Sequence, residues 1–342
     1  MRCRRGRFSR WPGRRCSCGS WVVAGGGCMA ERRLIWLGLV LALVSAGFLL
    51  WQLNGPVGII LGLRASKLVA LLVVGAAAGA ATLIFQTVIG NQLLTPNLMG
   101  LDALYIFLQM TLVFVFGAAG YAGIGPGWGF ALNVSVLLIV VLAVFHLFLR
   151  GGVSDVTRVV LTGVVLGLLL RGLSDLMGRL IDPSEFGVVQ QAVVASFGRV
   201  DRGELAVAAG ALILALGLAW RMVPALDVAG LGRPVARGLG LDHDGLVRRA
   251  LGLVVVLVAV ATALVGPLMF LGLLAASLAR YLVPSHRHAL LLPAAAMTGA
   301  LILVAGQFLF ERLLGQQSAL EVVVEFFGGL VFLGLVLRRR RM

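Results

Sequence analysis

Charged residues are scarce in this sequence: they make up 13% of its 342 residues, whereas hydrophobic residues make up 60%. Soluble domains usually carry about 25% charged residues, so a soluble globular protein is excluded. Crossing a hydrocarbon core of about 30 Å takes roughly 20 helical residues. The chain is long enough for about ten such crossings with short loops, and it has no room for a large soluble domain.

Motifs for nucleotide binding and for hydrolysis are missing. A phosphate-binding loop ends in Gly-Lys-Ser/Thr, but the only lysine, Lys67, follows Ser66. Neither Gly-x-Ser-x-Gly nor His-Glu-x-x-His occurs, which argues against the enzyme alternative, a membrane-embedded hydrolase. We therefore predict no catalytic residue and no cofactor bound by this chain. If the chain works with ATP, a partner subunit must hold the ATP and Mg²⁺.

Acidic residues at membrane depth are few, which argues against a second alternative, an ion-coupled secondary transporter of a small solute. Asp102 lies near the end of an apolar stretch, and Arg171 and Asp175 are four residues apart near the outer end of another. The simplest expectation for Arg171 and Asp175 is an i,i+4 ion pair. Because ionisable residues within spans are functional candidates, both are also possible contacts for an anionic substrate.

Histidine and cysteine offer no metal site. His286 and His288 flank Arg287 without a third ligand nearby, so we expect solvated loop residues there. All four cysteines lie within the first 28 residues, where Cys16 and Cys18 lack the usual two-residue spacer. No metal ligands are predicted.

The first 28 residues form an Arg- and Gly-rich extension that we expect to be disordered, followed by a transmembrane domain over 29–342. Met29-Ala-Glu-Arg-Arg33 reads like a natural start before the first span. The apolar run after Arg33 is about 20 residues long and lacks a small-residue cleavage pattern, so we interpret it as a membrane anchor rather than a signal peptide.

The apolar stretches predict an all-α, polytopic membrane protein of about ten transmembrane helices. The eighth stretch is short and flanked by proline, so it need not cross completely. The expected spans are 34–53, 67–89, 98–116, 130–149, 158–177, 205–222, 246–265, 268–282, 289–309 and 320–337.

The distribution of basic residues predicts the topology. With the N-terminus in the cytoplasm, only seven of the 29 basic residues fall outside: Arg64, Lys67, Arg171, Arg179, Arg199, Arg202 and Arg312. By the positive-inside rule, both termini are cytoplasmic in a multi-pass protein of the cytoplasmic (inner) membrane. The net charge of +15 is thus a topology signal, and no nucleic acid partner is expected.

Small residues and loop lengths indicate where helices and partners meet. The Gly-x-x-x-Gly pairs Gly75/Gly79 and Gly163/Gly167 predict faces of close helix packing. The segment 223–249 is long and forms the largest expected cytoplasmic surface, and a partner would dock there. The outer segment 178–204 mixes charged and apolar residues, and we expect short interfacial helices in it.

Several motifs closely resemble the permeases of iron-siderophore and vitamin B12 ABC importers, the FecCD type. The most specific is Gly266-Pro-Leu-Met-Phe-Leu-Gly272 continuing to Arg280, with His286 to Pro293 and Gly299-Ala300 after it. Further matches in register are Arg64-Ala-Ser-Lys67 leading to Gly75-Ala76, Asn91-Gln-Leu-Leu-Thr-Pro96-Asn-Leu-Met-Gly100, Arg158-Val-Val-Leu161-Thr-Gly163-Val-Val-Leu-Gly167 and Ala236-Arg-Gly-Leu239-Gly240. The resemblance runs from about Leu34 to Arg341.

The resemblance implies an assembly. Two ten-helix permease subunits, identical or different, would bind two cytoplasmic ATPase subunits and an outer substrate-binding protein, periplasmic or lipid-anchored. The pathway at the dimer interface would be lined by 158–177 and 320–337. The implied ATPase-coupling residues, within 226–241, are Leu226, Gly232, Ala236, Arg237, Leu239 and Gly240.

The resemblance also implies that Arg64, Lys67 and Arg312 receive acidic residues of the binding protein, which would steer docking more than tighten it. From the residues alone, snorkelling of these side chains at helix ends is the better explanation. Both interpretations place the three residues at the outer membrane surface.

Departures from the family pattern narrow the expected cargo. Many members have Pro-His at the place of Ala276-Ser277, and a tighter Arg-x-Pro-Arg at the place of Arg64-Ala-Ser-Lys67. The run from Thr95 to Asp102 resembles the ferric siderophore branch and argues against vitamin B12. The expected function is therefore that of a permease subunit, in contact with membrane lipid, that translocates a ferric siderophore and is driven by a separate ATPase.

Overall fold

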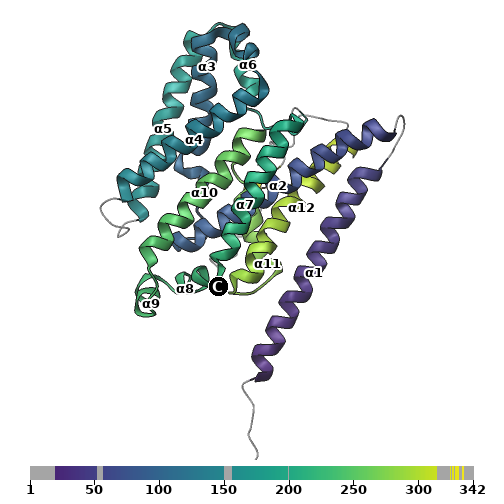
Figure 1. The fold of residues 1–342 in the computed structure, drawn as a ribbon, viewed down its shortest axis with the longest axis vertical. Helices are drawn as coiled ribbons and strands as arrows, with labels where there is room; N and C mark the ends of the chain where they lie inside the picture. The colour runs from purple at the N-terminus through teal and green to yellow at the C-terminus, as the bar shows by residue number, and fades with distance from the viewer. Residues whose placement is uncertain are drawn as a thin grey trace, which may run out of the picture.

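The computed structural model describes residues 20–51, 57–149, 156–198 and 200–313, together with 324, 326, 328–330 and 333–334. Within these residues the fold is all-α, as predicted, and no strand occurs. The helices are α1 (Ser20–Leu50), α2 (Val57–Ile89), η1 (Pro96–Met99), α3 (Leu101–Gly123), α4 (Pro126–Leu149), α5 (Val156–Leu180), α6 (Pro183–Val193), α7 (Arg202–Arg221), α8 (Val223–Ala229), α9 (Arg233–Gly238), α10 (His243–Val265), α11 (Leu271–Leu282) and α12 (His288–Leu313) (Figure 1).

Seven described helices are long and apolar enough to cross a membrane: α1, α2, α3, α5, α7, α10 and α12. The apolar helices α4 and α11 have shorter described segments. These nine helices coincide with the first nine expected spans. The tenth, 320–337, lies mostly outside the described residues, so the ten-span count and the side of the termini stay predictions.

Two helix ends differ from the expected spans. The helix α1 begins at Ser20 rather than near residue 34, and α2 begins at Val57 rather than near 67. The run from Val57 to Leu63 is almost entirely apolar, so the helix continues through it. As a result, Arg64 and Lys67 lie inside α2 and not in a loop before it.

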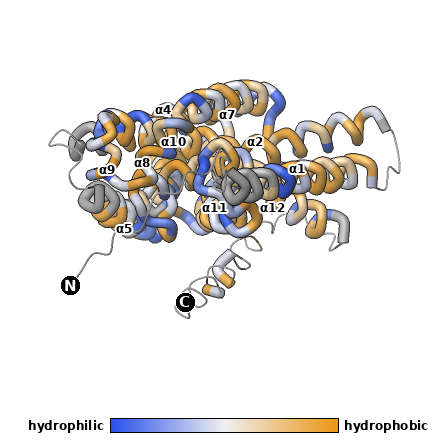
Figure 2. Tube along the Cα trace, turned by 90° about the horizontal axis from the view of Figure 1, so that it is seen from below, coloured by the Kyte–Doolittle hydropathy of each residue, from blue (hydrophilic) through white to orange (hydrophobic). Residues whose placement is uncertain are grey.

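The helices α2 and α10 form the centre of the bundle. About 72% of the apolar window of each is buried, compared with 11% for α1 and 22% for α5. Membrane helices keep apolar residues on lipid-facing surfaces, because lipid tails are as apolar as leucine. Figure 2 shows hydrophobic residues along the long helices even where they face outwards.

Close contacts at glycine join α2 to α12. A Cβ added at Gly79 would lie 2.0 Å from the carbonyl oxygen of Ala295, and one at Gly75 would lie 2.6 Å from the backbone of Ala300. The helix backbones therefore touch directly, as small-xxx-small faces allow. The packing face predicted for Gly75/Gly79 is confirmed.

The second glycine pair is also confirmed as a packing face. Gly163 of α5 lies against Met99, at the end of η1, and Gly167 lies against Gly100. Thus η1 is held between α5 and the central helices.

Short helices lie at opposite ends of the bundle, α6 at one end and α8 with α9 at the other (Figure 1). The helix α6 confirms the short helix predicted within 178–204. Its Glu185 accepts a hydrogen bond of 3.1 Å from the N–H of Ala118, just after a break in the helical backbone at Gly117 of α3. The N-terminal end of α1 points to the same end as α8 and α9 (Figure 1).

Candidate functional site

The segment 223–241, which we call the elbow, folds into the two short helices α8 and α9. Gly232 precedes α9 with a φ of +94°, and Gly240 follows it with a φ of +82°. Glycine adopts such left-handed values without the steric strain that a Cβ would add. The two glycines therefore fix the turns of a helix-turn-helix at the position expected from the sequence.

The elbow has a buried side and an exposed side. Leu226 and Ala236 are completely buried and anchor it to the bundle. Leu231, Val235 and Leu239 are spaced four residues apart, and each is at least half exposed. Val235 lies in α9, and Leu231 and Leu239 flank that helix, so the three form an exposed apolar group on and beside α9, of the kind that binds a partner. We call these three residues the apolar stripe.

Sequence reasoning found only part of this division. Leu226, Gly232, Ala236 and Gly240 shape or anchor the elbow, whereas Leu239 alone of the predicted coupling residues is an exposed apolar one. Leu231 and Val235 were not identified; Val235 lies four residues before Leu239, which was a usable signal for it alone.

The remaining predicted coupling residue, Arg237, is tied to α10. Its Nη2 lies 2.7 Å from Oδ2 of Asp244, and Nη2 of Arg233 lies 3.6 Å from Oδ1 of the same carboxylate. The Arg237 side chain is about half exposed, and such surface ion pairs contribute about 0–1 kcal/mol. Arg237 therefore steadies α9 against α10 only modestly.

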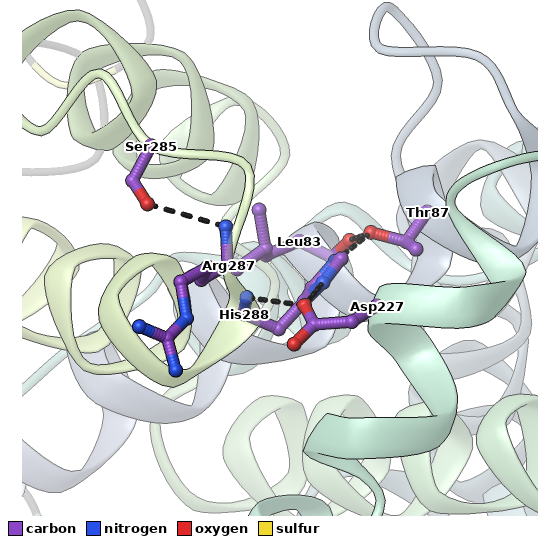
Figure 3. A network of polar contacts seen from close by, with 6 residues as sticks. All are labelled: Leu83, Thr87, Asp227, Ser285, Arg287 and His288. Atoms are coloured by element: carbon purple, nitrogen blue, oxygen red, sulfur yellow. Dashed lines mark hydrogen bonds and ion pairs between the residues drawn. The ribbon is translucent and has the colours of Figure 1, made fainter. Parts of the chain in front are cut away.

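A more buried polar contact ties α8 to the central helices. Oδ1 of Asp227 accepts hydrogen bonds from the backbone N–H of His288, at 2.6 Å, and lies 2.7 Å from Nδ1 of its ring. Nε2 of the ring lies 2.8 Å from Oγ1 of Thr87, near the end of α2 (Figure 3). We call Thr87, Asp227 and His288 the His288 network.

The prediction that His286 and His288 are both solvated is wrong for His288. His286 is exposed, but His288 is buried as the first residue of α12. Its partners lie 61 and 201 residues away in the sequence, so local spacing gave no sign of them.

Where α1 ends and α2 begins, two of the three predicted docking residues have partners within the chain. Nη1 of Arg64, a buried residue, donates to the carbonyl oxygens of Leu49 at 3.0 Å and Trp51 at 2.7 Å. These carbonyls at the end of α1 have no helical partner of their own. Nζ of Lys67 lies 2.8 Å from Oε2 of Glu311 in α12. The side chain of Arg312 lies outside the described residues.

A cavity of about 370 Å³ lies between the start of α3, α5 and the turn before α11. Its lining is mostly apolar, and it includes Asp102, Arg171, Asn97, Met269 and Phe270. The structure thus brings Arg171 and Asp102 to one cavity, which their distance in the sequence did not predict. Among the described residues, no group of three or more His, Cys, Asp or Glu could hold a metal ion.

The ion pair expected between Arg171 and Asp175 is wrong. No ion pair joins these side chains in the part of the chain that the structure describes, and Nη2 of Arg171 instead lies 3.9 Å from Sδ of Met269. The turn before α11 lies close to α5, so Arg171 reaches across to it rather than along its own helix. Asp175 is exposed and does not line the cavity.

Comparisons with known proteins extend over nearly the whole chain. Residues 50–338 match the model of the FecCD transport family. The chain is 36% identical over 301 residues to the petrobactin import system permease protein YclO of Bacillus subtilis (strain 168), which covers 88% of this chain and 96% of that protein. It is 30% identical over 321 residues to the petrobactin import system permease protein FatC of Bacillus anthracis, which covers 91% of this chain and 90% of that protein.

A solved structure has the same fold. It is an inward-facing conformation of a metal-chelate type ABC transporter, and it matches with a TM-score of 0.78 over 90% of this chain and 99% of that chain. The two sequences are 21% identical, so this likeness concerns the fold alone.

Proposed function

The chain belongs to the FecCD transport family, and on this premise we propose that it is the permease subunit of an ABC importer that carries a ferric siderophore across the cytoplasmic membrane. The observation that carries the proposal is an apolar helical body with an anchored elbow that exposes apolar residues. The relatives that import petrobactin support a ferric siderophore as the cargo. The absence of a phosphate-binding loop from the sequence supports the proposal that a partner subunit hydrolyses the ATP.

We propose that the elbow is the surface that binds the ATPase. The apolar stripe of Leu231, Val235 and Leu239 would enter a groove of the partner, as amphipathic helices do. The buried Leu226 and Ala236, with the turns at Gly232 and Gly240, hold the stripe in place. Each of two permease subunits would bind one of two ATPase subunits.

A second permease subunit, identical or different, would cover α5. In a single chain this helix leaves Leu161, Val165 and Leu169 exposed. The second element proposed for that interface, 320–337, lies mostly outside the described residues. A pathway between two copies of α5 would pass close to the cavity that contains Arg171.

Arg171 is the residue that we propose contacts the cargo. It lines the cavity, and its guanidinium would attract an anionic chelate. Asp175, one turn further along α5, is the second pathway candidate. Its carboxylate is exposed, in keeping with a place near the route rather than in the cavity.

At the outer end we propose that basic residues steer a substrate-binding protein, through Arg64, Lys67 and Arg312. Steering depends on net charge near the surface. Arg312→Glu should therefore lower the association rate severalfold, whereas the double variant Lys67→Met with Glu311→Met, which leaves the net charge unchanged, should not. Equal rates for both variants would reject this docking site. Arg64 is left unchanged because its substitution would also uncap α1.

The proposed function is tested by uptake into proteoliposomes. The permease is reconstituted with its ATPase subunits and binding protein, and radioiron-labelled ferric petrobactin is followed. We expect accumulation that requires ATP and the ATPase, and none of labelled vitamin B12. Accumulation without any ATPase would instead support the ion-coupled secondary transporter.

A further inference from the structure

We propose that the His288 network is the joint through which movement of the elbow reaches the transmembrane helices. This inference rests on the proposed function, in which the ATPase moves the elbow. It assigns a positioning role to Thr87, Asp227 and His288, none of which contacts the cavity.

The three residues lie where a joint is needed. Asp227 belongs to α8, Thr87 to the last turn of α2, and His288 is the first residue of α12. The helix α8 packs against both α12 and α2, and these two long helices pack against each other over much of their length. A displacement of α8 therefore acts on the pair at its cytoplasmic end.

The contact of Asp227 with α12 is a helix cap supplied from another helix. Oδ1 of Asp227 accepts from the first N–H of α12, which has no partner within that helix. A carboxylate at this position is also favoured by the helix dipole. Such charge-assisted hydrogen bonds are about twice as strong as neutral ones.

Donor counting explains how the link continues to α2. The Thr87 hydroxyl lies 2.9 Å from the carbonyl oxygen of Leu83 and 2.8 Å from Nε2 of His288, but it has only one proton to donate (Figure 3). Nδ1–H donates to the Asp227 carboxylate, and the direction of the hydrogen bond between Nε2 and the Thr87 hydroxyl is set by the ring tautomer. The chain of hydrogen bonds from α8 to α2 is complete.

The elbow has a second polar attachment, the ion pair of Arg237 with Asp244, and it is the weaker one. The Arg237 and Asp244 side chains are 51% and 25% exposed, whereas those of His288 and Asp227 are 7% and 35% exposed, so the more buried member is His288. A hydrogen bond in a low-dielectric site is stronger than one in water. Force on the elbow is therefore passed through α8 to α2 and α12 rather than through α9 to α10.

The two nitrogens of His288 can be tested separately. In His288→Asn the amide can take the place of Nδ1 and keep the link to Asp227, but the link to Thr87 is lost. In His288→Gln the amide can take the place of Nε2 and keep the link to Thr87, but the side-chain link to Asp227 is lost. Thr87→Val removes the hydroxyl with little change of volume, and Asp227→Ala removes both contacts to α12.

The measured quantity is the amount of ferric petrobactin taken up per ATP hydrolysed in reconstituted transporter, with ATPase binding to each variant as the check of folding. We expect ATPase affinity to stay unchanged. The uptake ratio should fall about tenfold in Asp227→Ala and about threefold in His288→Asn, His288→Gln and Thr87→Val.

The double variants give the decisive pattern. Thr87→Val and His288→Asn remove the same link, so together they should lower the ratio no further than either alone. Thr87→Val and His288→Gln remove different links, so together they should lower it about as far as Asp227→Ala. A residue that merely stabilises the fold would lower ATPase binding and uptake in parallel.

The outcomes separate the two proposals. If the wild-type protein shows no ATP-dependent uptake, the proposed function is overturned and this inference with it. If the wild-type protein couples uptake to hydrolysis and Asp227→Ala and Thr87→Val keep the wild-type ratio, the inference alone is overturned.

Discussion

The two ends of the α2 and α12 pair are both joined by polar side chains, but they connect to different parts of the molecule. At one end, Lys67 of α2 binds Glu311 of α12, and Gln307 donates to the same carboxylate at 3.1 Å. At this end α2 is also joined to α1, because Arg64 donates to the carbonyl oxygens of Leu49 and Trp51. At the other end, the His288 network continues beyond the pair to Asp227 of the elbow.

The difference identifies the end of the α2 and α12 pair that is attached to the elbow. Between the two ends, the backbones touch at Gly75 and Gly79, so the pair moves as one packed unit. We expect this unit, which is joined to the elbow at one end and to α1 at the other, to follow movement of the elbow. Three substitutions test, in turn, the packing of α2 against α12, the apolar stripe of the elbow and the contact between Lys67 and Glu311.

The largest effect is expected from Gly79→Ala, which disrupts the backbone contact between α2 and α12. The new methyl would lie 2.0 Å from the Ala295 carbonyl oxygen, so the backbones must separate. We expect a loss of about 3 kcal/mol or more in stability and little folded protein. The measurement is the yield and thermal midpoint of the detergent-solubilised protein.

Gly210→Ala in α7 is the matched control. A Cβ there would meet nothing within 4 Å, so the same added methyl should be neutral or stabilise by up to about 1 kcal/mol. Equal thermal midpoints for the two variants would show that the backbone contact between α2 and α12 is not needed.

The next largest effect is expected from Val235→Glu, which changes the surface of the elbow that we propose binds the ATPase. A charge in the middle of the apolar stripe should weaken ATPase binding about 30-fold, as at the centre of other interfaces, while leaving the fold intact. Trp128→Glu adds the same charge at an exposed apolar residue at the start of α4 and should leave ATPase affinity unchanged. Binding to immobilised ATPase measures both, and equal losses would place the docking surface elsewhere.

The smallest effect is expected from Glu311→Gln, which removes the carboxylate that pairs with Lys67. Both side chains of the pair are less than a fifth exposed, so Lys67 would lose its counter-charge in a partly buried site. We expect a loss of about 1–2 kcal/mol in stability. Lys67→Met combined with Glu311→Met should recover most of the thermal midpoint, because no unpaired charge remains. A double variant as unstable as the single one would contradict this explanation.

The sequence predicted what depends on local pattern. Apolar stretches located the described long helices, glycine spacing identified the faces of α2 and α5, and the elbow was expected at its position with Gly232 and Gly240 at its turns. Each of these features is set by residues within a few turns of one another.

Contacts between distant segments were not predictable in the same way. His288 is buried only because Asp227 and Thr87 meet it from two other helices. Arg171 was expected to pair along its own helix, but the turn at Met269 supplies a nearer neighbour. Family resemblance identified the elbow, yet it did not separate the buried Ala236 from the exposed Val235 beside it.

The most direct test compares Asp227→Ala with Glu311→Gln in one measurement, ferric petrobactin taken up per ATP hydrolysed in proteoliposomes. Both variants remove a carboxylate that contacts α12, one at each end. We expect the ratio to fall about tenfold for Asp227→Ala and to stay within about twofold of wild type for Glu311→Gln. Equal falls, or a fall only for Glu311→Gln, would contradict a cytoplasmic joint between the elbow and the α2 and α12 pair.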